Sequence, residues 1–419
     1  MMRALYLCLL LVLLPLALWG CSYGHGNIRQ DKGFFHEPHD FVLQFDDKGN
    51  IWDTAVAQRA LDTIAYQSRI TNTIVLTFVH GWHHNARTDD ANVLDFARAL
   101  ARTRAVLDDA PTGNPGPYTA SRLALTTSGD VKVIGIYVGW RGRSLPMPLN
   151  YLTFWGRKKA AEQVGAGDLK PFLLNLNRIY RERNKARMNR PGAPFMGLAT
   201  FGHSFGGQVA FKAVAETLEH ELNTAPNGAV LQGYGDLTVL VNPALEAGQY
   251  ESIHQLSTRR SYHPAQSPLL LVLSSEGDWA RKWMFPAARM LGKGFGQRMS
   301  GPPELWGLAL GEYVPHRTHV IHVDLERPLG ERPFDPSDYV ERPCVLAKMD
   351  LGAERSFQNV HVKPLKNTPY NPFIVAYTNN DLVIQHSGIF EESLRNFLND
   401  FVALTQGKRM VVSNPSVRC

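Results

Sequence analysis

Apolar, often β-branched residues form short, nearly uninterrupted runs along this chain, and these runs alternate with segments in which apolar residues recur every three or four positions. The runs predict strands that are buried on both faces, and the periodic segments predict amphipathic helices. The predicted strands are 41–45, 73–79, 131–138, 196–201, 237–241, 269–273 and 373–377. The predicted helices are 53–67, 89–107, 169–180, 205–222 and 394–402. This alternation predicts an α/β fold whose central sheet is mainly parallel and is flanked by helices.

The first 20 residues do not share this pattern. A short positive start at Met1 to Arg3 is followed by 15 uncharged residues from Ala4 to Leu18. That stretch is short for a membrane-spanning helix and typical of a secretory signal. The end of the stretch, Leu18-Trp19-Gly20-Cys21, resembles the lipobox of bacterial lipoproteins, in which the chain is cut before the cysteine and that cysteine is lipidated.

The lipobox resemblance implies a lipoprotein signal peptide over residues 1–20, a lipid anchor at Cys21 and a tether over 21–40. The protein is then expected in the bacterial cell envelope, anchored to a membrane and facing the periplasm or the exterior. An ordinary signal peptide, with Cys21 incidental, is the alternative. The oxidising setting permits a disulfide between Cys344 and Cys419, and two free thiols are an equal alternative.

The composition is that of a folded protein, with 44% hydrophobic and 20% charged residues in a chain of 419, which excludes a disordered or fibrous chain. Residues 286–370 fit the strand–helix alternation poorly, so we expect one domain over 41–419 with an insertion at about 286–370 rather than two domains. The net charge is only +6. Segment 178–190 is basic but lacks interleaved aromatic residues, so a membrane surface or plain solvation is expected there and not a nucleic acid.

The pentapeptide Gly202-His203-Ser204-Phe205-Gly206 matches the pattern G-x-S-x-G, between a predicted strand and a predicted helix. A serine at such a turn occupies a strained backbone conformation, and side chains two residues away on either side would collide. The glycines relieve that crowding, and the start of the helix places main-chain N–H groups beside the serine. Ser204 is therefore the candidate nucleophile.

A second loop, His80-Gly81-Trp82, directly follows the strand 73–79. Its small residue allows the main chain to turn toward a neighbouring strand end, so the N–H groups of Trp82 and Phe205 are candidates for an oxyanion hole. His80, His83 and His84 form H-x-x-H-H, but no carboxylate–histidine pattern on a helix accompanies them. We therefore expect no metal site.

These two loops, about 120 residues apart, resemble those of the α/β-hydrolase family, in particular a bacterial group with FVHGW loops. The resemblance covers roughly residues 41–290 and 371–404. It implies the α/β-hydrolase fold with cap or insert segments, and a serine, an acid and a histidine in that chain order. It also implies an esterase, lipase, thioesterase or related acyl-transfer activity that needs no cofactor.

The resemblance implies an acid just after strand 269–273, where Asp278 is the first choice and Glu276 the second. It also implies a histidine between the last strand and the last helix, where His386 lies, with His361 as the fallback. His316 is a further candidate. His319 and His322 are instead expected on one face of a strand.

The leading hypothesis is a membrane-anchored serine hydrolase that acts on a small-molecule or lipid ester. An acyltransferase that uses the same site is the first alternative, because both reactions share the acyl-enzyme step. A catalytically idle binding or scaffold protein of the envelope is the second, because a fold alone does not prove a function.

Overall fold

The computed structural model describes residues 39–108, 131–144, 153–190, 192–278, 301–324, 352–357, 360–398, 401–402 and 405. The predicted signal peptide, nearly all of the tether, and the three cysteines Cys21, Cys344 and Cys419 lie outside the described residues. So does most of the segment 286–370 that was expected to be an insertion.

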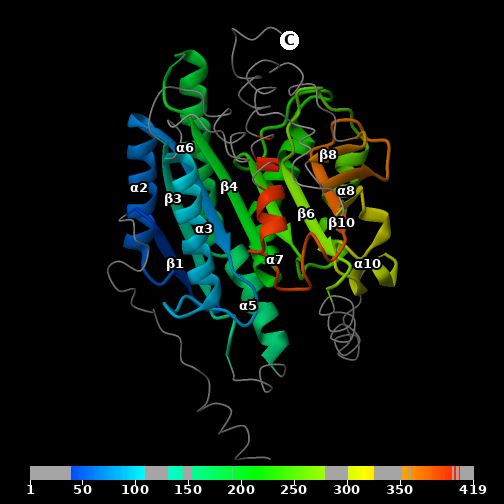
Figure 1. Cartoon of the computed structure of the whole chain (residues 1–419), viewed down its shortest axis with the longest axis horizontal. Coiled ribbons are helices and arrows are strands. Elements are labelled where there is room, and N and C mark those ends of the chain that lie inside the picture. Colours follow the sequence, from blue (N-terminus) through cyan, green and yellow to red (C-terminus); the bar gives the residue numbers. More distant parts are fainter. Residues whose placement is uncertain are drawn as a thin grey trace, which may run out of the picture.

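Ten strands form a single sheet in the order β1-β3-β2-β4-β5-β6-β10-β7-β9-β8 (Figure 1). Their bounds are β1 Phe41–Phe45, β2 Asn72–Val79, β3 Val131–Trp140, β4 Met196–His203, β5 Leu237–Val241, β6 Leu270–Ser275, β7 His319–Val323, β8 Arg355–Phe357, β9 Val360–Pro364 and β10 Phe373–Thr378. In this spatial order, each neighbouring pair from β1 across the sheet as far as β7 is parallel, including the pairs that β10 makes with β6 and β7. The pairs β7–β9 and β9–β8 are antiparallel. The prediction of an α/β fold with a mainly parallel sheet is confirmed.

Helices cover both faces of this sheet. One face packs against α2 (Thr54–Ile70), α5 (Phe154–Ala166), α6 (Leu169–Asn189), α7 (Phe205–Thr224) and α8 (Ala247–Thr258). The other face packs against α3 (Ala91–Asp108) and the helical segment 392–398. Two short elements, α10 (Pro303–Gly307) and the 3₁₀ turn η3 (Val314–His316), precede β7.

Successive strand residues belong to different cores, because side chains alternate across a sheet. On β6, Leu270 and Val272 belong to the core that includes residues of α7, whereas Leu271 and Leu273 belong to the core that includes residues of α3 and of the segment 392–398. Both faces are buried, which explains why the strands appear in the sequence as continuous apolar runs.

The described part of segment 286–370 extends the main sheet, since β7 pairs directly with β10 and carries β9 and β8 beyond it. His319 and His322 do lie on the strand β7, but the expectation that they share a face is wrong. A spacing of three residues places them on opposite faces. His319 is buried, and the ring of His322 stacks on that of His361 with the centroids 5.0 Å apart.

The start of α7 lies against the end of β2. A Cβ atom added to Gly206 would lie 2.1 Å from the carbonyl oxygen of Val79 and 2.5 Å from that of His80. A Cβ atom on Gly202 would lie 2.6 Å from the carbonyl oxygen of Gly206. The strand-to-helix turn therefore depends on glycine at both positions, as the pentapeptide predicted.

Gly206→Ala is expected to destabilise the protein by about 1–3 kcal/mol or more, because the contacts of the new methyl group are with main-chain atoms that cannot move aside. Gly156→Ala is the matched control, since its Cβ would meet nothing within 4 Å and alanine favours a helix. Thermal unfolding of both variants checks this. Equal melting temperatures would contradict the close approach of α7 to β2.

Candidate active site

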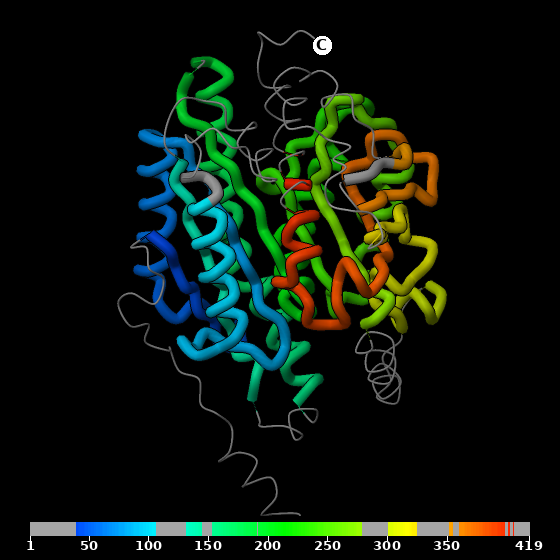
Figure 2. Tube along the Cα trace, in the orientation of Figure 1, coloured from blue at the N-terminus to red at the C-terminus, as the bar shows by residue number. Residues whose placement is uncertain are grey.

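The carboxyl ends of parallel strands meet at one edge of the sheet, where ligands bind in open α/β proteins. Ser204 follows the end of β4, Asp278 lies three residues after β6, and His386 lies eight residues after β10. Figure 2 shows the segment after β10, in orange and red, running along this edge. The sheet thus gathers three side chains that are far apart in the sequence.

Ser204 occupies a backbone conformation that is rare for residues with a side chain, with φ 54° and ψ −122°. Its N–H donates to the carbonyl of Val241 at 3.1 Å, and its own carbonyl accepts from the N–H groups of Gly207 and Ala244, each at 3.0 Å. Such conformations persist only where the surroundings enforce them, and they gather at functional sites. The turn presents the Ser204 side chain at the end of the sheet.

His386 connects Ser204 to Asp278. Its Nδ1 lies 2.9 Å from Oδ2 of Asp278, and its Nε2 lies 2.9 Å from Oγ of Ser204. An ionised carboxylate only accepts hydrogen bonds, so Nδ1 carries the proton and Nε2 is left to accept the hydroxyl of Ser204. The Asp278 side chain is fully buried and that of His386 is 28% exposed. This arrangement can move a proton from Ser204 to His386 while Asp278 holds the ring and stabilises its charged form.

The remaining acid and histidine candidates lie elsewhere. Glu276 is exposed and accepts a hydrogen bond from the main-chain N–H of Asn380 at 3.3 Å. His316 contacts Glu251 through Nε2 at 2.7 Å, and His361 stacks on His322. The structure therefore brings Asp278 and His386, and not their alternatives, to Ser204.

The loop after β2 is held by His80. The main-chain N–H of Trp140 donates to Nε2 of His80 at 3.0 Å, so Nδ1 carries the proton that is donated to the carbonyl of Gly81 at 2.8 Å. The indole N–H of Trp140 donates to the carbonyl of His80 at 3.0 Å, and the two rings stack with an interplanar angle of 2°. Burial lowers the pKa of His80 to about 4, so the ring is neutral at pH 7.

This loop touches the nucleophile. A Cβ atom on Gly81 would lie 2.9 Å from Cβ of Ser204, so only glycine allows the approach. The ring of Trp82 lies 6.0 Å from that of Phe205, measured between centroids. The two candidate oxyanion residues thus stand beside each other, one next to Gly81 and the other next to Ser204.

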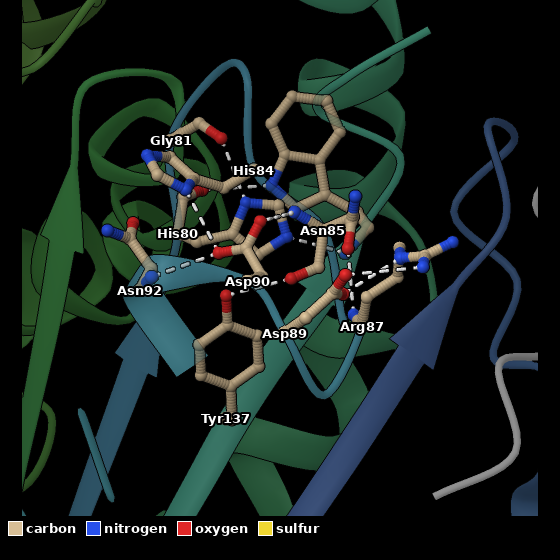
Figure 3. A network of polar contacts seen from close by, with 10 residues as sticks. His80, Gly81, His84, Asn85, Arg87, Asp89, Asp90, Asn92 and Tyr137 are labelled. Atoms are coloured by element: carbon tan, nitrogen blue, oxygen red, sulfur yellow. Dashed lines mark hydrogen bonds and ion pairs between the residues drawn. The ribbon is translucent and has the colours of Figure 1, made fainter. Parts of the chain in front are cut away.

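A carboxylate that the sequence did not single out anchors the far side of the loop (Figure 3). Asp90 accepts from the ring of His84 at 3.0 Å and from the main-chain N–H groups of Asn85 and Asn92 at 3.1 and 2.9 Å. The hydroxyl of Tyr137 donates to the carbonyl of Asn85 at 3.0 Å. An acidic residue just before a helix is a helix N-cap signal, so the position of Asp90 could have been found.

Ring nitrogens of the histidine-rich motif therefore already make hydrogen bonds within the protein. Both ring nitrogens of His80 bond to the main chain, and Nδ1 of His84 bonds to Asp90. Within the described ranges, no group of three or more His, Cys, Asp or Glu side chains is arranged to hold a metal ion.

Three aromatic rings, of Trp82, Phe154 and Phe205, contact one another where the candidate oxyanion loop meets the start of α7. The ring of Phe154 lies 5.2 Å from those of both Trp82 and Phe205, measured between centroids. Phe205 is buried, whereas Trp82 and Phe154 are half-buried.

Comparison of the chain with protein-family models, with curated proteins and with solved structures finds no match.

The stability of this site should depend on pH through its buried histidines. Burial lowers the pKa of His203 to about 3, whereas an unfolded histidine titrates near 6.5. Between these values the unfolded chain binds a proton that the folded chain excludes, so stability is fully present above pH 6.5 and falls as the pH drops toward 3.

We expect each such histidine to add up to about 1.4 kcal/mol per pH unit to this slope. Urea unfolding of the wild type and of His203→Gln from pH 7.5 to 4.5 measures how the free energy of unfolding changes with pH. The slope should be smaller in the variant by the contribution of one histidine. An unchanged slope in His203→Gln would show that His203 is not held neutral.

Proposed function

We propose that this protein is a serine hydrolase with an α/β-hydrolase fold and that it cleaves an ester-type bond in a carboxylic ester, a lipid or a thioester. The observation that carries the proposal is the hydrogen-bonded row of Ser204, His386 and Asp278 at the carboxyl ends of parallel strands. The chain order of serine, acid and histidine and the strained turn at Ser204 support it.

In this reaction, Oγ of Ser204 attacks the carbonyl carbon of the substrate while its proton passes to Nε2 of His386. Asp278 stabilises the resulting imidazolium. The main-chain N–H groups of Trp82 and Phe205 bind the oxyanion of the tetrahedral intermediate. His386 then gives its proton to the leaving group as the carbon–oxygen or carbon–sulfur bond breaks.

Water completes the cycle. It attacks the acyl ester on Ser204, gives a proton to His386, and releases the acid while the proton returns to Oγ of Ser204. The half-buried rings of Trp82, in the candidate oxyanion loop, and of Phe154, which contacts it, suit an apolar part of the substrate. We therefore infer an ester whose acyl or alcohol part is apolar. No step in this cycle requires a cofactor.

A fluorophosphonate probe should label wild-type protein at Ser204 and leave Ser204→Ala unlabelled. Hydrolysis of p-nitrophenyl esters should fall by about 10⁴-fold in Asp278→Asn, because the histidine loses the partner that fixes its tautomer. Glu276→Gln, an exposed carboxyl group two residues away, should keep wild-type activity. A wild-type protein that is neither labelled nor active would overturn the proposal in favour of an idle envelope protein. Acyl transfer to an added alcohol in excess of hydrolysis would favour the acyltransferase.

We also propose that Cys21 carries a lipid anchor, on the basis of the lipobox-like sequence. In the part of the chain that the structure describes, no helix combines the length and the apolar character needed to cross a membrane. Wild-type protein expressed in a bacterium should sediment with membranes, and intact-mass analysis should show an acylated N-terminal cysteine. Cys21→Ala should lose both properties, and Cys419→Ser should keep both. A mature wild-type protein that starts elsewhere and lacks acylation would refute the anchor.

A further inference from the structure

The main chain around His386 accepts hydrogen bonds from side chains at the ends of three strands. Nε2 of His203 donates to the carbonyl of His386 at 2.7 Å. Nδ2 of Asn242 donates to the carbonyl of Gln385 at 2.9 Å and to that of His386 at 3.3 Å. Oγ of Ser275 donates to the carbonyl of Val383 at 2.7 Å.

The three donors come from neighbouring strands of the sheet. His203 is the last residue of β4, Asn242 directly follows β5, and Ser275 is the last residue of β6. All three side chains are buried, and Asn242 and Ser275 have no exposed surface. Because buried donors require hydrogen-bond partners, loss of these contacts would be costly, and they therefore tie the loop to the strand ends.

Asn242 also links two of the strand ends. Its Oδ1 accepts the main-chain N–H of Ser275 at 2.9 Å, while its Nδ2 reaches the loop. Its backbone has a φ of 46°, a conformation that asparagine tolerates better than most residues. The side-chain oxygen of Asn242 therefore accepts a hydrogen bond from β6, and its side-chain nitrogen donates to the loop that carries His386.

The loop itself has little regular structure between β10 and the helical segment 392–398. Its internal hydrogen bonds include the N–H of Gly388 to the carbonyl of Ile384 at 3.0 Å and the N–H of Gln385 to Oδ1 of Asn380 at 2.8 Å. These bonds shape the loop but do not fix its place over the sheet. The loop is tied to the sheet by the burial of Leu382 and Val383 in the core and by the contacts of the three side chains from the strand ends.

His203 has a particular place because it directly precedes Ser204. The hydrogen bond from His203 thus connects the segment that carries Ser204 with the carbonyl of His386. The rings of His203 and His386 lie 5.0 Å apart, measured between centroids. Its proton must reside on Nε2, because a carbonyl can only accept. Among the described residues, Nδ1 of His203 meets no hydrogen-bond partner.

We propose that His203, Asn242 and Ser275 are positioning residues that set the distance between Oγ of Ser204 and Nε2 of His386 by holding the carbonyls of the 383–386 segment. This inference rests on the proposed hydrolase function. Reacting groups must be placed closely, and a misplacement of about 1 Å can cost about 10²-fold in rate. Loss of a donor should therefore lower kcat and leave KM largely unchanged.

The first test compares two substitutions at one position. His203→Phe keeps a ring but removes the donor, and should lower kcat for a p-nitrophenyl ester by about 10- to 100-fold with KM within about threefold of wild type. His203→Gln places an amide N–H near the position of Nε2 and should restore most of kcat. Equal kcat in wild type and a folded His203→Phe would overturn the role of His203.

The second test uses Asn242→Gly, which removes the amide and still permits the positive φ. It should lower kcat in the same way. Thr238→Val is the matched control, a buried residue near the start of β5 whose Oγ1 meets no hydrogen-bond partner among the described residues, and it should keep wild-type kcat. The double variant His203→Phe/Asn242→Gly should lose less than the product of the two single losses, because both side chains hold the carbonyl of His386. Independent losses would contradict a shared clamp.

Two further measurements guard against misfolding and against failure of the proposed function. If His203→Phe or Asn242→Gly does not fold, Ser275→Ala tests the same loop through the carbonyl of Val383. If wild-type protein is not labelled by the fluorophosphonate, the hydrolase proposal fails, and amide hydrogen exchange of residues 380–389 then tests the clamp alone. Exchange there should be faster in Asn242→Gly than in Thr238→Val, and equal rates would overturn it.

Discussion

The turn at Ser204 depends on a contact between the start of α7 and the end of β2 that is too close to leave room for a side chain. The first helical turn of α7 lies so close to β2 that a Cβ atom on Gly206 would overlap the carbonyl oxygen of Val79. Ser204, directly before this helical turn, has a φ of 54°, and the close approach places the serine beside the loop that leaves β2. The same geometry explains Gly81, whose missing side chain lets that loop touch Ser204. The position of the serine and the position of the candidate oxyanion loop are thus consequences of one close packing of a helix start against a strand end.

Burial assigns different chemistry to three of the histidines near this edge, His80, His203 and His386. His80 and His203 are almost completely buried, and burial lowers their pKa values to about 4 and about 3, respectively. The ring N–H of each donates a hydrogen bond to a main-chain carbonyl. His386 is partly exposed, and a buried carboxylate faces its Nδ1. Of these three, only His386 has one ring nitrogen that faces a carboxyl group and another that faces a hydroxyl group. The environment, and not the residue type, separates the structural histidines from the candidate base.

The parallel sheet supplies the frame in which these groups meet. Because β4, β5 and β6 are neighbours and run the same way, the residues at their ends form a row under the loop that carries His386. Donors on that row hold carbonyls of the loop, and the loop in turn holds the ring between Ser204 and Asp278. The catalytic geometry that we propose is therefore shared between the sheet and a loop with little regular structure of its own.

The sequence by itself was sufficient for seven of the eight strands that pair in parallel, the helix after Ser204 and the need for glycine at the turn, because local patterns and steric limits determine these features. It assigned β7, the eighth parallel strand, to an expected insertion. The resemblance to the α/β-hydrolase family added Asp278 and His386 as the expected acid and histidine, although it left Glu276 and His361 open. The prediction from sequence was wrong in placing His319 and His322 on one face, and it did not find Asp90, Asn242 or Ser275 or a role for His203. These assignments required the tertiary structure, because the order of strands in the sheet, which brings residues 203, 242 and 275 beneath residues 383–386, is set by packing between segments distant in the chain.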